Sequence, residues 1–591
     1  MSHERILSAE SLLHLPTSIP LVDQLGGDAI WKYFAMCLET PRPSSKLDQI
    51  RAKVTGVADR LGLVHKTDRA GNVLICKPAT PGYEHVAAVA LQCHLDMVTS
   101  KNEGVEHDFD VDPIRVRIDG DWLKAESTTL GADDGIGVAA CLALLEDIAP
   151  ERMELEGRSH KDKREFVHPA LELLFTADEE TTMSGAMDID PELLKARLMI
   201  NVDSEEQNSI CIGCAGGFEK ILLLPVEWAE NGDDAAALST PGTFTLLSVH
   251  LKGLLGGHSG AQIHEPLGNG IQLLARILSN TIDAAPAGAD VRLAAYKGGT
   301  AINAIPREAR AVVAVRTAHV AEVVTLLDTA FASVVRGRYT LEQEPNAVLA
   351  VATMSGSDDW HRTVPTPLKV VEDELGESPA FAAGATNARL CALTPTSTRA
   401  SLDYITSLHH GVIYKSREVE GLVETSIAFT VAQLTDSGLY CHLFARSSND
   451  AHMVEVSQRL DESHGASWWE AHGLTQLAET AASRINGKTL QKFGPTPALN
   501  GFPGWMPNPH TDLLKSTRSA YESEYGVQPR VYAVHAGLEC GFWQRTFAGM
   551  ECVSVGPEVA AAHSPDERLE ISTVRPFMRV LRATLDLLCR Q

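Results

Sequence analysis

The chain has 591 residues, more than one hydrophobic core usually accommodates, so we expect two or more domains or one domain with a large insertion. Hydrophobic residues make up 44% and charged residues 22%, which excludes a disordered, collagen-like or disulfide-stapled chain. The net charge of −26 would repel phosphate backbones and anionic lipids, so neither nucleic acid nor a membrane is an expected partner.

The first third of the chain predicts alternating strands and helices. The segment 86–97, VAAVALQCHLDM, is a continuous apolar run that ends in polar residues, which is typical of a strand buried on both faces of a parallel sheet. Similar strands are expected at 170–180 and 197–206, and apolar spacing at 135–148 predicts a helix between the first two strands. This order favours an α/β fold with a doubly wound, mostly parallel sheet.

The middle of the chain predicts a separate α+β insert. Strand-like and helix-like segments alternate there at 243–253, 267–282, 307–317, 321–335, 438–448 and 453–465. Segments of the first kind resume near residue 500, with strands at 530–539 and 550–558 and a helix at 572–589. The catalytic domain is therefore expected to be split in sequence.

The predicted domains are a first catalytic part at 1–216, the insert at 217–497 and a second catalytic part at 498–591. Three further stretches have the composition of surface additions, at 151–166, 229–242 and 378–400. Their purpose cannot be inferred from their composition.

Acids and histidines gather at the predicted strand ends and the loops beside them. In an open α/β sheet, ligands bind at the carboxyl ends of the strands. The candidates are His94, Asp96, Asp133, Asp134, Asp178, Glu179, Glu180, Asp203, Glu205, Glu206 and His563. Residues two apart in a strand face the same way, so Asp96 can accept the second N–H of His94 and leave its other nitrogen free for a metal. Imidazole and carboxylate ligands suit Zn²⁺, with Mn²⁺ or Co²⁺ as alternatives, and the spacing alone leaves the purpose of such a site open.

Eleven motifs then link the sequence to a known family. They are LQCHLDMV, TTLGADDGIGVA, LFTADEET, INVDSEE, GCAGG, GGHSGAQI, GGTAINAIPRE, EGLVETS, FPGWMPNP, HAGLECG and GPEVAAAHSPDERLE. In these motifs, which run from about Leu91 to Glu570, the sequence resembles the aminoacyl-histidine dipeptidases, a branch of the M20 metallopeptidases. The resemblance covers nearly the whole chain. It implies a catalytic domain of the zinc-exopeptidase type, split by an α+β lid and dimerisation domain.

The resemblance also implies a site with two divalent metal ions, most simply Zn²⁺. The implied ligands are His94, Asp133, Glu180, Asp203 and His563, with Asp133 bridging both ions. Two cations about 3.5–4 Å apart can share a water and lower its pKa. Glu179 is the implied general base, which takes the proton of that water and passes it to the leaving amine, while Asp96 orients His94.

The expected substrate is a dipeptide, either Xaa-His or a broader range. His258 is similar to a lid histidine that reaches the scissile carbonyl, often in the neighbouring subunit, and it would donate a hydrogen bond to the oxyanion. Asn303 and Arg446 resemble lid residues that hold the C-terminal carboxylate of the substrate. The resemblance implies a homodimer that forms through the lid domain.

Two residues depart from the family pattern, and two short motifs are rejected. Cys93 replaces a common glycine and is expected to be a packed thiol, whereas Asp134 replaces a common asparagine and is expected to add negative charge near the metals. The CIGC segment at 211–214 has no second CxxC and reads as ordinary strand-end cysteines. INGKT at 485–489 is not a phosphate loop, because Ala482 stands where the leading glycine belongs.

Two other functions remain open from the sequence. An aminoacylase on the same scaffold would require an acylated substrate, so the need for a free α-amino group separates it from a dipeptidase. A non-catalytic scaffold protein would not need the ligands and Glu179 that are present here. Eleven scattered cysteines, the absence of a signal-like N-terminus and the absence of a stretch of about 20 apolar residues predict a cytoplasmic protein.

Overall fold

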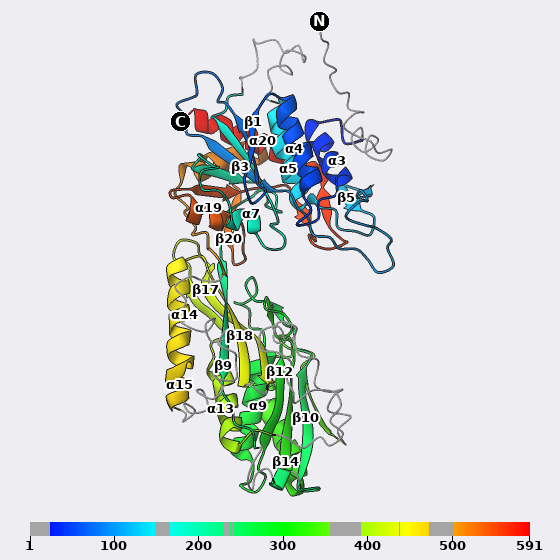
Figure 1. The fold of residues 1–591 in the computed structure, drawn as a ribbon, viewed down its shortest axis with the longest axis vertical. Helices are drawn as coiled ribbons and strands as arrows, with labels where there is room; N and C mark the ends of the chain where they lie inside the picture. Colours follow the sequence, from blue (N-terminus) through cyan, green and yellow to red (C-terminus); the bar gives the residue numbers. More distant parts are fainter. Residues whose placement is uncertain are drawn as a thin grey trace. The chain divides into compact units, whose positions relative to one another are not determined.

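The chain folds into two compact units (Figure 1). The computed structural model describes residues 24–147, 166–229, 236–238, 240–354, 392–435, 438–471 and 501–590. Unit 1 comprises Met1–Cys214 and Trp505–Gln591, and unit 2 comprises Ala215–Gly504. The chain therefore passes between the units after Cys214 and after Gly504. The boundaries predicted from the sequence were after residues 216 and 497.

Unit 1 is built on an eight-stranded, mostly parallel sheet. In spatial order its strands are β1 (Val64–Thr67), β2 (Val73–Lys77), β6 (Leu171–Thr176), β3 (Val89–His94), β7 (Leu198–Asn201), β21 (Glu551–Ser554), β8 (Ser209–Cys214) and β20 (Arg530–Val534). β6, β3, β7 and β21 run parallel to one another, as do β8 and β20. β3 and β6 are buried along their whole length, which explains their unbroken apolar sequences.

Helices pack around this sheet. They are α3 (Ala29–Glu39), α4 (Asp48–Arg60), α5 (Ala132–Asp147), α7 (Ser184–Met187), α18 (Asp512–Tyr525), α19 (Cys540–Thr546) and α20 (Ile571–Cys589). α5 packs against β3, and α18 packs against α20. The predicted helices at 135–148 and 572–589 correspond to α5 and α20, so strand and helix alternate as the sequence indicates.

A small antiparallel sheet in unit 1 joins distant parts of the chain. Its strands are β22 (Val559–Ala560), β23 (Arg568–Glu570), β5 (Trp122–Ala125) and β4 (Val116–Asp119). β23 pairs with β5 in antiparallel fashion, Leu569 opposite Leu123. This pairing anchors the loop between β22 and β23, which carries His563.

Unit 2 is an antiparallel sheet with helices packed on it. In spatial order the strands are β15 (Val348–Thr353), β10 (Phe244–Lys252), β14 (Ala309–Arg316), β12 (Arg292–Gly298), β17 (Val423–Thr435), β18 (Gly438–Ser447), β9 (Gly216–Leu224) and β19 (Gly501–Phe502), with β16 (Gly411–Lys415) also paired to β17. A separate two-stranded antiparallel sheet is formed by β11 (Gly257–His258) and β13 (Ala304–Ile305). The helices are α9 (Gly270–Ala284), α10 (Val320–Phe331), α13 (Pro395–Ser407), α14 (Asp450–His464) and α15 (Ala466–Ala471).

The core of unit 2 lies between its sheet and its helices. α9 begins where Asn269 accepts hydrogen bonds from the backbone N–H groups of Ile271 (3.1 Å) and Gln272 (3.4 Å), as a helix N-cap does. Its apolar face packs with α10 and α13 against alternate residues of β10 and β14. The predicted class, an α/β unit split by an α+β unit, is confirmed.

Among the described residues, one helical segment of unit 2 is long and apolar enough to cross a membrane, judged by length and composition alone. It runs through Thr317–Arg336 and includes α10. Val323, Leu327 and Val335 are fully buried in the core of unit 2. The expectation that no stretch is long and apolar enough to span a membrane is therefore wrong. Most apolar residues of this helix lie on the side that packs against the core of unit 2.

The predicted surface additions differ from one another in the structure. Segment 151–165 lies outside the described residues, as does 378–391. Residues 395–400 are the first turns of α13 rather than a surface addition, and Thr394 caps that helix by accepting from the Ser397 N–H at 3.2 Å. In 229–242, Ala229 and Leu238 are buried against the unit 2 sheet. These two apolar side chains are part of a second, minor core that composition alone did not reveal.

Candidate metal centre and substrate-binding residues

Three neighbouring parallel strands of unit 1 bring predicted residues to one edge of the sheet. β3 ends at His94, β6 is followed by Glu179 and Glu180, and β7 is followed by Asp203. β3 pairs in parallel with both other strands, so the three carboxyl ends lie together.

The two other predicted ligands come from loops. Asp133 stands at the start of α5, and His563 lies between β22 and β23. Ala561 and His563 both have left-handed backbone conformations, with φ of 56° and 64°. Such conformations are uncommon for residues other than glycine and occur where the surrounding structure holds them. The turn they form brings the His563 imidazole to Asp133.

The donor atoms of the five predicted ligands form two groups. Nε2 of His94 lies 3.0 Å from Oδ1 of Asp133 and 3.5 Å from Oδ1 of Asp203. Nε2 of His563 lies 3.0 Å from Oδ2 of Asp133 and 3.0 Å from Oε2 of Glu180. Each group contains one imidazole and two carboxylates, with donor atoms within 4.8 Å of one another. Asp133 places one carboxylate oxygen in each group, as a bridging ligand would.

Asp96 connects the His94 strand to the two glutamates. Its Oδ1 lies 3.4 Å from Nδ1 of His94 and accepts a hydrogen bond from the backbone N–H of Glu179 at 3.0 Å. Its Oδ2 accepts from the backbone N–H of Glu180 at 3.2 Å and from the hydroxyl of Ser44 at 2.7 Å. The completely buried carboxylate therefore orients one imidazole and fixes the backbone of both glutamates.

Burial and neighbouring charges shift the pKa values of several side chains around the two groups. Burial, with Asp133 and Glu180 as further causes, raises the pKa of Asp203 to about 7. Burial also raises the pKa of Glu179 well above its usual range, and nearby Asp203 acts in the same direction. Burial would lower the pKa of His94, but Asp203 and Asp133 hold it well above its usual value.

This electrostatic environment fits divalent cations. Carboxylates that repel one another at a buried edge are stabilised when a cation lies between them. Each of the two groups offers imidazole nitrogen and carboxylate oxygen, and neither includes a thiolate. Zinc, manganese and cobalt accept such mixed nitrogen and oxygen ligands.

Unit 2 holds the three predicted substrate-binding residues. His258 ends β11, and the backbone N–H of the next residue, Ser259, donates to the carbonyl of Asn303 at 2.9 Å. β11 pairs with β13, and His258 lies opposite Ala304, so Asn303, which precedes β13, lies close to His258. Arg446 is part of β18. Burial and the positive charge of Arg446 both lower the pKa of His258, which favours the neutral imidazole.

The hydrogen bonds of His258 define its tautomer. Nδ1 accepts from the backbone N–H groups of Gly260 at 3.2 Å and Ala261 at 2.9 Å. A neutral imidazole that accepts at one nitrogen carries its proton on the other. Nε2 of His258 is thus available as a hydrogen-bond donor.

Arg446 is a buried cation. Its side chain lies over the ring of Phe444, 4.5 Å from the ring centroid, and the residue is 5% exposed. Nε finds no hydrogen-bond partner among the residues that the structure describes. Burial lowers the pKa of Arg446 to about 10. A guanidinium in such surroundings is stabilised by an anionic partner, and a carboxylate matches its planar geometry.

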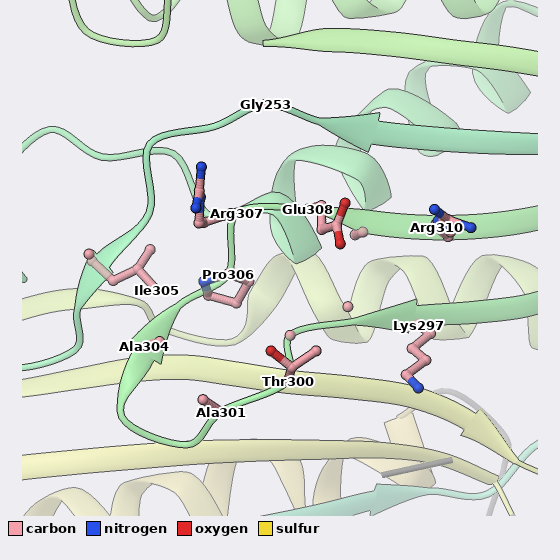
Figure 2. A pocket seen from close by; sticks show the side chains of 14 residues that line it. Gly253, Lys297, Thr300, Ala301, Ala304, Ile305, Pro306, Arg307, Glu308 and Arg310 are labelled. Carbon is pink, nitrogen blue, oxygen red and sulfur yellow. The ribbon is translucent and has the colours of Figure 1, made fainter. Parts of the chain in front are cut away.

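A cavity of about 420 Å³ lies in unit 2, beside the loop that carries Thr300 and Ala301 and leads to Ala304 (Figure 2). Three cationic residues, Lys297, Arg307 and Arg310, and one acid, Glu308, contribute to its lining. The three predicted substrate-binding residues do not line it. Gly257 and Ala304, the chain neighbours of His258 and Asn303, do line it, so the cavity adjoins these two residues.

A buried polar network beneath the metal groups was missed by sequence reasoning. Nε2 of Gln92 donates to Oε2 of Glu539 at 2.5 Å, and the Thr176 hydroxyl donates to the same oxygen at 2.8 Å. Nδ2 of Asn201 donates to Oε1 of Gln92 at 2.7 Å. Gln92, Thr176 and Asn201 lie on β3, β6 and β7, so the network joins the three strands that supply ligands. The HAGLECG motif contained Glu539, but nothing in its sequence indicated a partner.

The two departures from the family pattern lie in different surroundings. Asp134 is buried, accepts from the backbone N–H of His94 at 3.2 Å and from that of Gly137 at 3.1 Å, and burial raises its pKa well above the usual range. Its carboxyl group therefore supports the His94 backbone. Cys93 is a buried thiol, and Cys211 and Cys214 are buried and free. The INGKT segment lies outside the described residues.

Comparisons with known proteins agree with the motifs. Residues 249–335 match the peptidase dimerisation domain of the M20 family. The cytosol non-specific dipeptidase of Escherichia coli (strain K12) is 32% identical over 564 residues, which cover 95% of this chain and 98% of that protein. The crystal structure of aminoacylhistidine dipeptidase from Vibrio alginolyticus is 29% identical, with a TM-score of 0.71, and the match covers 99% of this chain and 98% of that one.

The chain belongs to the M20 family of peptidases, in the branch that contains these two dipeptidases. It is an enzyme of the hydrolase class. The resemblance inferred from the eleven motifs is thereby confirmed.

Proposed function

We propose that this protein is a metal-dependent dipeptidase whose two divalent ions are bound in unit 1. The proposed ligands are His94, Asp133, Glu180, Asp203 and His563. The observation that carries the proposal is the Asp133 carboxylate, because one oxygen lies 3.0 Å from the His94 imidazole and the other 3.0 Å from that of His563. Both relatives described above are named as dipeptidases.

Zn²⁺ is the proposed ion, with Mn²⁺ or Co²⁺ as alternatives. The mixed imidazole and carboxylate donor set supports this choice. When bound, such ions lower the pKa of a water molecule and polarise the peptide carbonyl.

Glu179 is proposed as the general base. It would take a proton from the attacking water and return it to the amine of the leaving residue. Burial raises the pKa of Glu179 well above its usual range, which supports this role because a more basic carboxylate accepts a proton more readily. The neighbouring Glu180, whose Oε2 lies 3.0 Å from His563, would bind metal instead.

The substrate-binding roles are assigned to unit 2. His258 would donate its Nε2–H to the oxyanion that develops on the scissile carbonyl. Arg446, aided by Asn303, would bind the C-terminal carboxylate of the dipeptide. The buried guanidinium, with its Nε unpartnered among the described residues, supports this assignment.

A dipeptide library tests this proposal and the preferred leaving residue together. Xaa-His dipeptides, including β-alanyl-histidine, would be compared with other dipeptides and with their N-acetylated forms, using protein loaded with Zn²⁺, Mn²⁺ or Co²⁺. We expect hydrolysis of Xaa-His substrates with a free amino group. Preferential cleavage of the acetylated forms would instead identify an aminoacylase.

The enzyme is further proposed to act as a homodimer in the cytosol. The dimerisation-domain match at 249–335 and the cytosol enzyme among its relatives support this. Light scattering is expected to give twice the chain mass of 63.8 kDa, and a monomer at all concentrations would contradict it.

A further inference from the structure

Glu567 is a buried acid whose carboxylate is bound entirely by backbone amides. It lies four residues after His563, at the end of the same loop, and is 2% exposed. Oε2 accepts from the N–H groups of Leu130 at 2.8 Å and Gly131 at 2.9 Å. Oε1 accepts from those of Ala132 at 2.8 Å and Asp133 at 3.3 Å. The Glu567 carboxylate thus accepts a hydrogen bond from each backbone N–H of residues 130–133, the segment that ends at Asp133.

Arg42 holds the same segment through its carbonyl groups. Its Nη2 donates to the carbonyl of Gly131, and its Nη1 donates to the carbonyls of Leu95 at 3.1 Å and Asp96 at 2.5 Å. Arg42 is also 2% exposed. A Cβ at Gly131, where φ is 70°, would lie 2.6 Å from Nη2 of Arg42. The segment is therefore enclosed closely by two charged side chains.

These contacts connect the loops that carry the two metal groups. Glu567 joins the His563 loop to the Asp133 segment, and Arg42 joins the Asp133 segment to the backbone beside Asp96. Buried charges cost free energy unless hydrogen bonds compensate them, and here the compensating groups belong to the segment that presents Asp133.

We propose that Glu567 is a positioning residue for the metal centre. It holds the Asp133 carboxylate at a fixed distance from His563 before any ion binds, so that both groups of ligands are formed in advance. The inference rests on the proposed function, because it assumes that Asp133 binds metal. A simple helix cap would bind amides of the first helical turn, yet Leu130 and Gly131 precede α5 and lie in the loop.

Glu567→Gln tests the role with the smallest change in shape. The amide has a single acceptor oxygen, and its NH₂ would face two of the four N–H groups. Residues that orient metal ligands typically change metal affinity by about 10–100-fold when altered, and we expect weakening in this range for Zn²⁺ and Co²⁺, measured by equilibrium dialysis. The matched control is Asp566→Asn, which removes the same charge from the exposed neighbouring residue and should leave affinity unchanged.

Hydrogen exchange on the metal-free wild type and on metal-free Glu567→Gln tests the same point without measuring metal binding. The four amides from 130 to 133 should be protected before metal is added, and Glu567→Gln should release them while the strands of the sheet stay protected. Wild-type affinity in a folded Glu567→Gln protein, or unprotected amides in the metal-free wild type, would overturn the inference. A wild type that binds no divalent metal would instead overturn the proposed function. The affinity measurement therefore tests the proposed function, and the exchange measurement tests the positioning role of Glu567 separately.

Discussion

The carboxylate of Asp96 accepts a hydrogen bond from the backbone amide of Glu179, with 3.0 Å between Oδ1 and the nitrogen. The same oxygen lies 3.4 Å from Nδ1 of His94. One buried carboxylate therefore sets the positions of a proposed metal ligand and of the proposed general base.

Asp96→Asn is expected to weaken metal binding and dipeptide hydrolysis together, each by about 10–100-fold. The substituted amide would turn an NH₂ group toward backbone N–H donors or toward the imidazole, and either arrangement loses a hydrogen bond. Equilibrium dialysis and initial rates measure both effects. Glu103→Gln, at an exposed position of unit 1, is the control. Unchanged affinity in the Asp96 variant would contradict the orienting role.

Adjacent glutamates should respond differently to the same substitution. Glu179→Gln is expected to keep both ions and to lose about 10²–10⁴-fold in turnover, because it removes only proton transfer. Glu180→Gln is expected to lose metal affinity first, because Oε2 of Glu180 lies in the group formed with His563. Metal content per chain and kcat, measured on both variants, separate the roles. Equal metal loss in the two would refute the distinction.

His258→Ala should lower kcat by about 10²–10³-fold, the usual effect of removing one oxyanion donor, with a smaller change in KM. The reason is the Nε2–H, which the acceptor role of Nδ1 toward Ala261 makes available. Steady-state kinetics on one Xaa-His dipeptide provide the measurement. His264→Ala alters an exposed histidine nearby and should change neither constant. A KM effect alone would assign His258 to ground-state binding instead.

Arg446→Gln should raise KM for dipeptides more than for dipeptide amides, which lack the carboxylate. A charged hydrogen bond contributes about 1.5–3 kcal/mol, so the loss in kcat/KM for the acid should be roughly tenfold or more. The two substrates would be compared in both proteins. If the variant loses the same factor for acid and amide, Arg446 does not bind the carboxylate.

The gathering of His94, Glu180 and Asp203 at one sheet edge was predictable, because these three proposed ligands end or follow continuous apolar strands. His94 at the end of β3 and Asp203 after β7 are recognisable from that change of composition, and parallel pairing brings them together. The separation of Glu179 from Glu180 came from the family resemblance, because adjacent acids have no distinguishing local pattern.

The supporting residues could not be predicted, because their roles depend on tertiary contacts. Glu567 accepts hydrogen bonds from backbone amides of residues 130–133, more than 430 residues away in the sequence. Arg42, from the N-terminal region, donates to the carbonyl of Gly131 in the same segment. The burial of Ala229 and Leu238 likewise results from packing on a distant sheet, which the polar composition around them concealed.

The most direct test of the account is the return of activity as metal is restored. Chelated, metal-free protein would be titrated with Zn²⁺ while hydrolysis of β-alanyl-histidine and bound metal are recorded on the same samples. We predict no turnover without metal and a rise to full activity as two ions bind per chain. Full turnover by the metal-free protein, or metal binding that never restores hydrolysis of any dipeptide, would contradict the account.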